Sequence, residues 1–127
     1  MSIYGIDFGC SKACIAVTGE DGIPIIVQNY ADGTHTLDCA VYFDNNNSVI
    51  VGAVAKDMAE VEGERVIQFI KQELGQSGDR TYEFDGKTYS PIEIAAFIFI
   101  RLKQIVEVFE PAFAVAKGAA IYSQAFM

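Results

Sequence analysis

Short apolar segments alternate with polar, glycine-containing turns over the first thirty residues, a pattern that predicts strands. Residues 3–8, 13–18 and 23–28 fit three strands, and residues 19–22 fit a hairpin turn. Apolar residues fall on both faces of the first strand, as in a sheet that is covered on both sides. Pro24 favours an edge position for the third strand. We therefore expect the chain to begin with an antiparallel three-stranded meander.

The following stretch predicts a loop and a second strand pair. Residues 29–38 are polar and contain glycine, so we expect a loop that leaves the meander. Residues 39–43 and 48–51 fit two strands that flank residues 44–47, an Asp-Asn-Asn-Asn turn. Asparagine and aspartate tolerate positive φ, which a tight hairpin requires.

Apolar residues at a helical period then predict two helices. The first covers residues 52–62 and ends at Gly63. The second covers residues 64–74, with Gly75 as its C-terminal stop. The side chains that we expect this second helix to bury are those of Val66, Ile67, Phe69, Ile70 and Leu74.

The last third combines a hairpin with a long helix. Residues 81–84 and 87–89 flank Asp85-Gly86, a strong hairpin signal. Next, Ser90-Pro91-Ile92-Glu93 is a helix start with an N-cap serine, a proline at the first helical position and a capping-box glutamate. This helix should run to about Glu110, and its Phe-Ile-Phe-Ile segment at 97–100 covers more than one face, so we expect it to lie buried between layers. Pro111 interrupts it, and residues 112–127 predict a further helix rich in small residues.

Composition limits the classes of partner. The 127 residues are 51% apolar, which fits one globular domain, or one domain with a small lobe. Nine basic and seventeen acidic residues give a net charge of −8, which argues against nucleic acid or an anionic membrane surface as the main partner. The start shows no signal-peptide pattern, and the longest apolar run, residues 94–100, is too short to span a bilayer. We expect a soluble, cytoplasmic protein.

The three cysteines, Cys10, Cys14 and Cys39, show no disulfide framework, so we expect free thiols in a reducing compartment. Together with His35 they suggest a metal site, but their spacing matches no standard zinc pattern. We favour the interpretation that they are small buried residues, and that His35 is a surface histidine.

Candidate chemistry lies at the turn after the first strand. Asp7 ends the strand, and Gly9 and small polar residues follow it. Such a turn aims backbone N–H groups and a hydroxyl at one point beside a carboxylate, which suits a phosphate with a metal ion. Asp-x-Gly turns also serve as plain turns, so the residues alone leave both interpretations open.

Five segments follow one another in a characteristic order. They are Gly5-Ile6-Asp7-Phe8-Gly9-Cys10-Ser11-Lys12, Asp32-Gly33-Thr34-His35-Thr36, Val51-Gly52-Ala53-Val54-Ala55-Lys56, Phe69-Ile70-Lys71-Gln72-Glu73-Leu74-Gly75 and Tyr89-Ser90-Pro91-Ile92-Glu93-Ile94. Together they resemble the N-terminal part of the ATPase domain of DnaK-type seventy-kilodalton heat-shock chaperones, in the actin-like ATPase superfamily, and the likeness runs over residues 3 to 110. A later segment, residues 114–122, resembles a helix near the end of the same domain. The second phosphate loop, the second lobe, the adenosine-contacting motif and the peptide-binding domain have no counterpart in these 127 residues.

The resemblance implies an α/β fold: a ribonuclease-H-like half-domain whose mixed sheet begins with the antiparallel meander, with helices packed against it. It implies a sheet subdomain of residues 1–37 and 111–127, whose last helix packs on the first sheet, and a small α+β lobe of residues 38–110.

The resemblance also implies a nucleotide site for ATP or ADP with Mg²⁺. Asp7 matches the acid that organises the hydrated metal. Gly9, Cys10, Ser11 and Lys12 match the phosphate loop, where the two residues after the glycine are usually threonines. Ser11 keeps a hydroxyl, whereas a thiol at Cys10 is a poor donor. Lys12 adds a cation that can compensate charge at a phosphate or point to solvent.

Lys71 matches the lysine that positions the attacking water and stabilises charge on the transferred phosphoryl group. On the bare sequence, an exposed helix lysine is the favoured interpretation of Lys71, whereas the resemblance favours the functional role. The acidic run Glu60, Glu62 and Glu64 is interpreted as a solvated face.

Three functions follow. The first is a truncated or minimal chaperone-type ATPase domain that is weak or inactive alone, whose parent couples ATP hydrolysis to protein folding with co-chaperones and unfolded polypeptides. The second is a non-enzymatic scaffold or interaction module, for which a homodimer is one of the possible forms. The third is another superfamily member, such as a sugar kinase, against which residues 51–56 and Lys71 argue.

Overall fold

The computed structural model describes residues 3–18, 21–76 and 80–109, which divide into two compact units. Unit 1 combines residues 3–8, 13–37 and 99–109, and unit 2 combines residues 9–12 and 38–98. Both units contain antiparallel strands and helical segments, so the predicted α/β class is confirmed. The predicted domain division stays a prediction, because residues 111–127 lie outside the described part of the chain.

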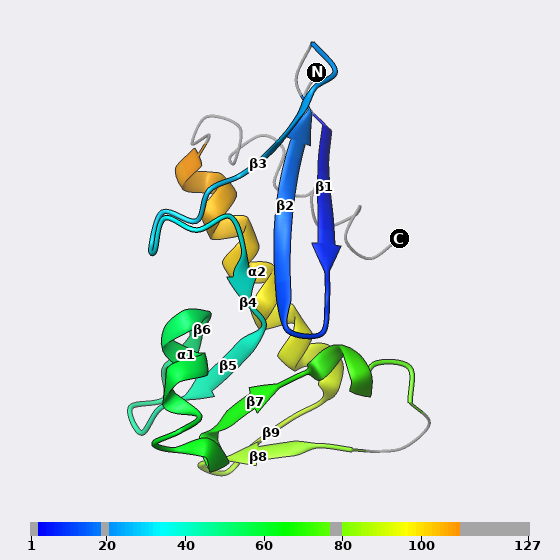
Figure 1. Ribbon diagram of the computed structural model, residues 1–127. Coiled ribbons are helices and arrows are strands. Elements are labelled where there is room, and N and C mark those ends of the chain that lie inside the picture. Colours follow the sequence, from blue (N-terminus) through cyan, green and yellow to red (C-terminus); the bar gives the residue numbers. More distant parts are fainter. Residues whose placement is uncertain (1–2, 19–20, 77–79, 110–127) are drawn as a thin grey trace. The chain divides into compact units, whose positions relative to one another are not determined.

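Unit 1 is built on the predicted meander. Strands β1 (Ile3–Phe8), β2 (Lys12–Thr18) and β3 (Pro24–Ile26) pair antiparallel in that order (Figure 1). Strand β3 is shorter than predicted and lies at the edge of this order, as Pro24 indicated. A two-residue strand, β4 (Leu37–Asp38), also pairs with β2, where the sequence predicted only loop.

The core of unit 1 lies on one face of the meander. Along β2, buried and half-buried residues alternate, and Ala13, Ile15 and Val17 are the buried ones. On β1, Tyr4 is buried whereas Ile3 is 61% exposed. The prediction that β1 is covered on both faces is therefore wrong, because its alternate residues remain accessible to solvent.

The sheet of unit 2 is centred on β5 (Ala40–Phe43), whose four residues are all buried. Strand β6 (Val49–Val51) pairs with one edge of β5 and β7 (Val66–Gln68) with the other, both antiparallel. The predicted pair of strands is thus confirmed, and Asn47 in its turn has a φ of 62°. Helix α1 (Ala53–Met58) follows Gly52, whose φ is 117°, and is shorter than the predicted helix over residues 52–62.

The helix predicted over residues 64–74 is wrong. The chain instead forms a 3₁₀ turn η1 (Gly63–Arg65), strand β7 and a second 3₁₀ turn η2 (Ile70–Glu73). Val66 and Ile67 are β-branched, and β7 pairs them with Tyr42 and Val41 of the buried β5. Pairing with a strand distant in sequence therefore outweighs the local helical period.

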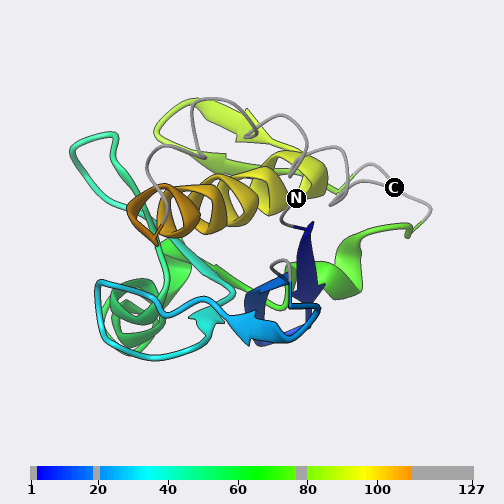
Figure 2. The same ribbon diagram turned by 90° about the horizontal axis from the view of Figure 1, so that it is seen from above.

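Strands β8 (Tyr82–Phe84) and β9 (Lys87–Tyr89) form the predicted hairpin, with φ of 53° at Asp85 and 82° at Gly86. Its aromatic rings pack on Phe43 of β5 and on Phe97 in the first turns of α2 (Pro91–Phe109). Figure 2 shows the backbone of the hairpin beside the start of α2. The Phe43 and Phe84 rings stack with centroids 4.3 Å apart, and Tyr89 lies 5.8 Å from Phe97.

Helix α2 begins and ends close to the predicted positions. Ser90 Oγ accepts a hydrogen bond from Glu93 N at 3.2 Å, and Glu93 Oε1 accepts one from Ser90 N at 3.1 Å, so the capping box is confirmed. Ile94, Ile98 and Leu102 are buried, whereas Ile92 is 68% and Ile100 44% exposed. The prediction that more than one face is buried is therefore wrong. No helix in the described residues has the length and apolar character to cross a membrane.

Candidate functional site: a phosphate-loop-like turn and an exposed lysine

The turn after β1 is closed by its backbone. Gly9 N donates a hydrogen bond to Lys12 O at 3.0 Å, which leaves Cys10 and Ser11 as the two turn residues, both exposed. A Cβ atom on residue 9 would lie 2.8 Å from the Lys12 carbonyl oxygen. No side chain fits at that distance, so the turn requires glycine at this position.

Two further contacts fix this turn within unit 2. Cys39 N donates to Ser11 O at 2.8 Å, and Lys12 Nζ lies 2.9 Å from Asp38 Oδ1. Lys56 Nζ lies 3.9 Å from the same oxygen. The sequence predicted a phosphate or solvent as the surroundings of Lys12, and it missed Asp38. No local signal could have found an acid that lies 26 residues away.

Asp7 lies in unit 1, one residue before the end of β1 and opposite Cys14 of β2. Its side chain is exposed, because residues alternate in burial along this strand and position 7 falls on the accessible side. An exposed carboxylate can accept hydrogen bonds from the water shell of a hydrated cation.

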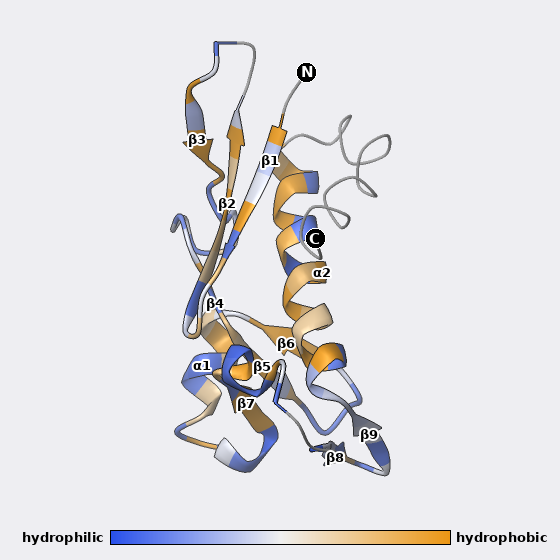
Figure 3. Ribbon diagram, turned by 90° about the vertical axis from the view of Figure 1, so that its right-hand side faces the viewer, coloured by the Kyte–Doolittle hydropathy of each residue, from blue (hydrophilic) through white to orange (hydrophobic). Residues whose placement is uncertain are grey.

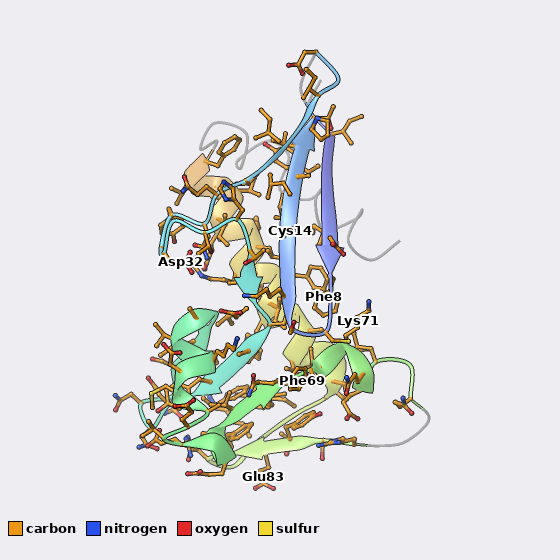
Figure 4. The ribbon with its side chains drawn as sticks, viewed as in Figure 1. Phe8, Cys14, Asp32, Phe69, Lys71 and Glu83 are labelled. Carbon is orange, nitrogen blue, oxygen red and sulfur yellow. The ribbon has the colours of Figure 1, made fainter. Side chains whose placement is uncertain are left out.

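Lys71 lies in unit 2 on η2, and its exposed side chain extends outward from that turn (Figure 4). The preceding residue, Ile70, is 1% exposed and fixes the turn in the core. Gln72 N donates to Phe69 O at 3.1 Å, and Leu74 N to Lys71 O at 3.3 Å. A single 3₁₀ turn, rather than the predicted helix, therefore carries this lysine.

A hollow of about 590 Å³ lies between η2 and the start of α2 in unit 2. Its lining is polar and apolar in nearly equal parts, and Arg80 Nη1 forms an ion pair with Glu73 Oε1 at 3.0 Å there. No pattern in the sequence had indicated this hollow. Its lining residues are Gln72, Glu73, Leu74, Gly75, Gln76, Arg80, Ser90, Pro91 and Ile92.

The cysteines differ from one another. Cys10 is exposed, Cys14 half-buried and Cys39 buried, and all three are free thiols, so the buried interpretation is correct for Cys39 and wrong for Cys10. Burial, with the negative charge of Asp38, raises the pKa of the Cys39 thiol to about 12 against the opposing effect of Lys12. His35 is exposed, as predicted. Within the described ranges, no three His, Cys, Asp or Glu side chains gather in a metal-binding cluster.

The predicted solvated acidic face needs a correction at Glu62. Glu60 and Glu64 are exposed, but the Tyr42 hydroxyl donates a hydrogen bond to Glu62 Oε2. This bond raises the pKa of the Tyr42 hydroxyl, because loss of its proton would place two negative charges side by side. Glu62 thus helps to hold β5 rather than only facing water.

The donor groups of the site fit a phosphate and a hydrated divalent cation in part. Ser11 offers an exposed hydroxyl on a turn too tight for a side chain at Gly9, and Asp7 offers an exposed carboxylate. The ammonium group of Lys12 already forms an ion pair with Asp38. Within unit 2, the turn therefore offers donor groups that suit an anion, and Asp7 in unit 1 offers an acceptor that suits the water shell of a cation.

Comparison with known protein families gives a match over most of the sequence. The family model described as "Hsp70 protein" matches residues 3–83, a range that covers Asp7, the turn at residues 9–12, and Lys71. The α/β fold with antiparallel sheets is consistent with a half-domain of the actin-like ATPase type that this family uses. Because the match spans more than half of the sequence, the chain belongs to the Hsp70 family.

Proposed function

We propose that this chain carries one wall of a DnaK-type nucleotide site. In this proposal, the N–H groups and the Ser11 hydroxyl of the turn contact the phosphates, and Asp7 holds the water shell of Mg²⁺. Lys71 orients the attacking water and balances charge on the transferred group. The observation that carries the proposal is the family match, which spans the turn and Lys71 together. The family normally binds ATP or ADP with magnesium.

We further propose that the chain is a truncated or minimal form of the ATPase domain. Phosphoryl transfer requires groups that position the nucleotide from several sides at once. These 127 residues supply the first phosphate loop and a lysine, but no segment that resembles the second loop or the adenosine motif. The isolated chain should then bind nucleotide weakly and turn it over slowly or not at all. Coupling to unfolded polypeptides and co-chaperones belongs to the parent architecture.

The test is a residue-resolved titration of the chain with Mg-ADP up to about 10 mM, a range suited to weak binding of about 4 kcal/mol or less. We expect the backbone amide signals of Gly9, Cys10 and Ser11 to shift in nuclear magnetic resonance spectra. Asp7→Asn should weaken the magnesium-dependent part of the shift, and Lys71→Ala should reduce binding of ATP. The exposed Lys87 serves as the matched control, since Lys87→Ala removes a surface lysine from the β8–β9 hairpin.

Two results contradict the proposal. One is the absence of any shift in the amide signals of residues 9–11 at a Mg-ADP concentration that would saturate an ordinary weak site. The other is robust ATP turnover by the isolated chain that disappears in Lys71→Ala, because one wall of a site should not support it.

A second candidate function is a non-enzymatic interaction module. The observation that favours it is a set of exposed isoleucines on β1 and β3 and before β3 in unit 1, which Figure 3 shows as hydrophobic. Their side chains are 45–61% exposed, and the residues are Ile3, Ile23, Ile25 and Ile26. Exposed apolar groups gathered on an edge strand favour association with another chain. Measurement of the mass in solution separates this function from the first.

A further inference from the structure

Phe69 has a backbone conformation that phenylalanine rarely adopts. Its φ of 59° and ψ of 35° place it in the left-handed region, directly between β7 and η2. Among the described residues, the other non-glycine residues with positive φ are Asn47 and Asp85, whose short polar side chains tolerate that region. A phenylalanine there is strained, so the surrounding fold must hold it in place.

Burial of the Phe69 ring does not compensate this strain, because the side chain remains 46% exposed. The burial of the neighbouring isoleucines explains the strained conformation better. Ile67 is 7% exposed and Ile70 is 1% exposed, so both reach the core of unit 2. In a continued strand, residues three apart would point to opposite faces. The left-handed residue between them reverses the chain and lets both isoleucines be buried.

The same reversal determines where Lys71 leaves the core. Phe69 O accepts the hydrogen bond from Gln72 N at 3.1 Å that closes the 3₁₀ turn, and Lys71 lies inside this turn, directly after the buried Ile70. Figure 4 labels Phe69 and Lys71 at this turn. The turn that carries Lys71 is therefore closed by the backbone of Phe69 and not by its ring.

We propose that Phe69 is a positioning residue for Lys71: its left-handed backbone holds the exposed ammonium group in one direction, ready for the phosphoryl group of a bound nucleotide. The role at the nucleotide rests on the proposed function. The control of Lys71 by the Phe69 backbone does not, and it is measurable without nucleotide.

Three substitutions separate the backbone from the ring. Phe69→Gly and Phe69→Asn remove the ring but favour the left-handed conformation, whereas Phe69→Val removes the ring and opposes it through β-branching. Phe109→Val is the matched control, because Phe109 is similarly exposed, at 48%, and lies in α2. Thermal unfolding of each variant identifies any that lose the fold. If Phe69→Val loses the fold, Phe69→Gly and Phe69→Asn still show whether the ring is needed.

The first measurement uses the nucleotide-free chain. We expect Phe69→Val to change the signals of the Lys71 side chain and to speed hydrogen exchange at the Gln72 amide by about fivefold or more, since the turn must open more often. The Gly and Asn variants should keep the wild-type signals and exchange within about twofold. Unchanged Gln72 exchange and Lys71 signals in a folded Val variant would overturn the proposal. So would equal changes in Gly and Val, which would assign the effect to the ring.

The second measurement adds Mg-ATP. We expect the Lys71 side-chain signal to shift in the wild type, and the apparent Kd to rise about fivefold in Phe69→Val but not in Phe69→Gly, because fewer molecules hold the competent turn. If the wild-type Lys71 signal does not move, the proposed function fails while the first measurement still decides the positioning role. If it moves equally in every variant, the positioning role at the nucleotide is wrong.

Discussion

Cys39 illustrates how burial determines the chemistry of a single side chain. The thiol is 3% exposed, and burial is the main reason that its pKa rises from 9.0 to about 12. At neutral pH it is therefore a protonated, unreactive thiol. Cys10, on the exposed turn, shares none of this protection from solvent. The sequence could suggest free thiols but not which one was buried.

Cys39 should make the stability of the protein depend on pH in the alkaline range. The unfolded thiol loses its proton near pH 9 and the native thiol near pH 12, so native protein binds more protons between these values. The free energy of unfolding should then fall as pH rises through this window, by up to about 1.4 kcal/mol per pH unit from this group. Urea unfolding of wild type and Cys39→Ala at pH 8, 9 and 10 measures the difference in slope. Tyr42 is present in both proteins, so its contribution cancels in this difference. Equal slopes of the unfolding free energy with pH in the two proteins would refute the assignment to Cys39.

The turn residue Cys10 offers a gain-of-function test of the proposed site. Cys10→Thr adds a hydroxyl donor where the family usually has threonine, and one hydrogen bond to a charged phosphate contributes about 1.5 kcal/mol or more. The dissociation constant for Mg-ADP should fall about tenfold in the titration described above. Cys10→Val has a similar shape without a donor, and equal tightening by valine would show that the hydroxyl is not the cause.

At the scale of elements, local signals predicted ends and turns well and predicted one element wrongly. The capping box at Ser90 and the Asp85-Gly86 turn depend on backbone conformations that nearby residues determine, and both are present. The stretch around Ile67 has a helical period but forms β7, because it pairs with β5. That pairing depends on residues more than twenty positions earlier, and no pattern within the stretch could reveal it.

The capping box should make a measurable contribution to stability. Ser90→Ala removes the acceptor for Glu93 N, and loss of an N-cap costs about 1 kcal/mol. Ser90→Asp keeps an acceptor and should stay close to wild type. Chemical unfolding monitored by circular dichroism measures both. Ser48→Ala is the control, since the hydrogen bonds between Ser48 and Asp44 use the Ser48 backbone. If Ser90→Ala proves as stable as Ser48→Ala, the box contributes nothing.

At the scale of the whole molecule, net charge and exposed apolar surface act against each other. A net charge of −8 makes copies of the chain repel one another, while the isoleucines of unit 1 favour their association. Salt screens the first effect and leaves the second largely intact. The balance between monomer and dimer should therefore depend on ionic strength.

Sedimentation at about 50 and 500 mM NaCl tests this balance, because the screening length falls from over 10 Å to under 5 Å over this range. We expect the average mass to rise with salt in the wild type and to stay monomeric in Ile25→Asp, which places a charge on the exposed β3. Ile92→Asp is the matched control, at 68% exposure on α2 in unit 2. Association that Ile92→Asp abolishes and Ile25→Asp preserves would place the contact elsewhere.

The candidate site was predicted only in its parts. The glycine and the small polar residues of the turn follow from local sequence, and the turn is present with Gly9 at a position that excludes any side chain. The ion pair between Lys12 and Asp38 and the left-handed Phe69 before Lys71 arise from tertiary packing. They decide how the charges of the site are held, which is why the sequence could name the residues but not their surroundings.

Apart from the short turn at residues 9–12, unit 2 consists of one continuous stretch, residues 38–98. Unit 1 consists of segments that come before and after that stretch. A chain that leaves the ribosome from its N-terminus therefore completes unit 2 first. The opening hairpin must wait for residues 99–109, although it is synthesised earlier. At about 5–20 residues per second, the delay between the hairpin and those residues lasts several seconds. During that time Ile15 of β2 lacks its neighbours Leu102 and Ile105, so nascent chains stalled before residue 99 should be the most susceptible to aggregation and to chaperone capture.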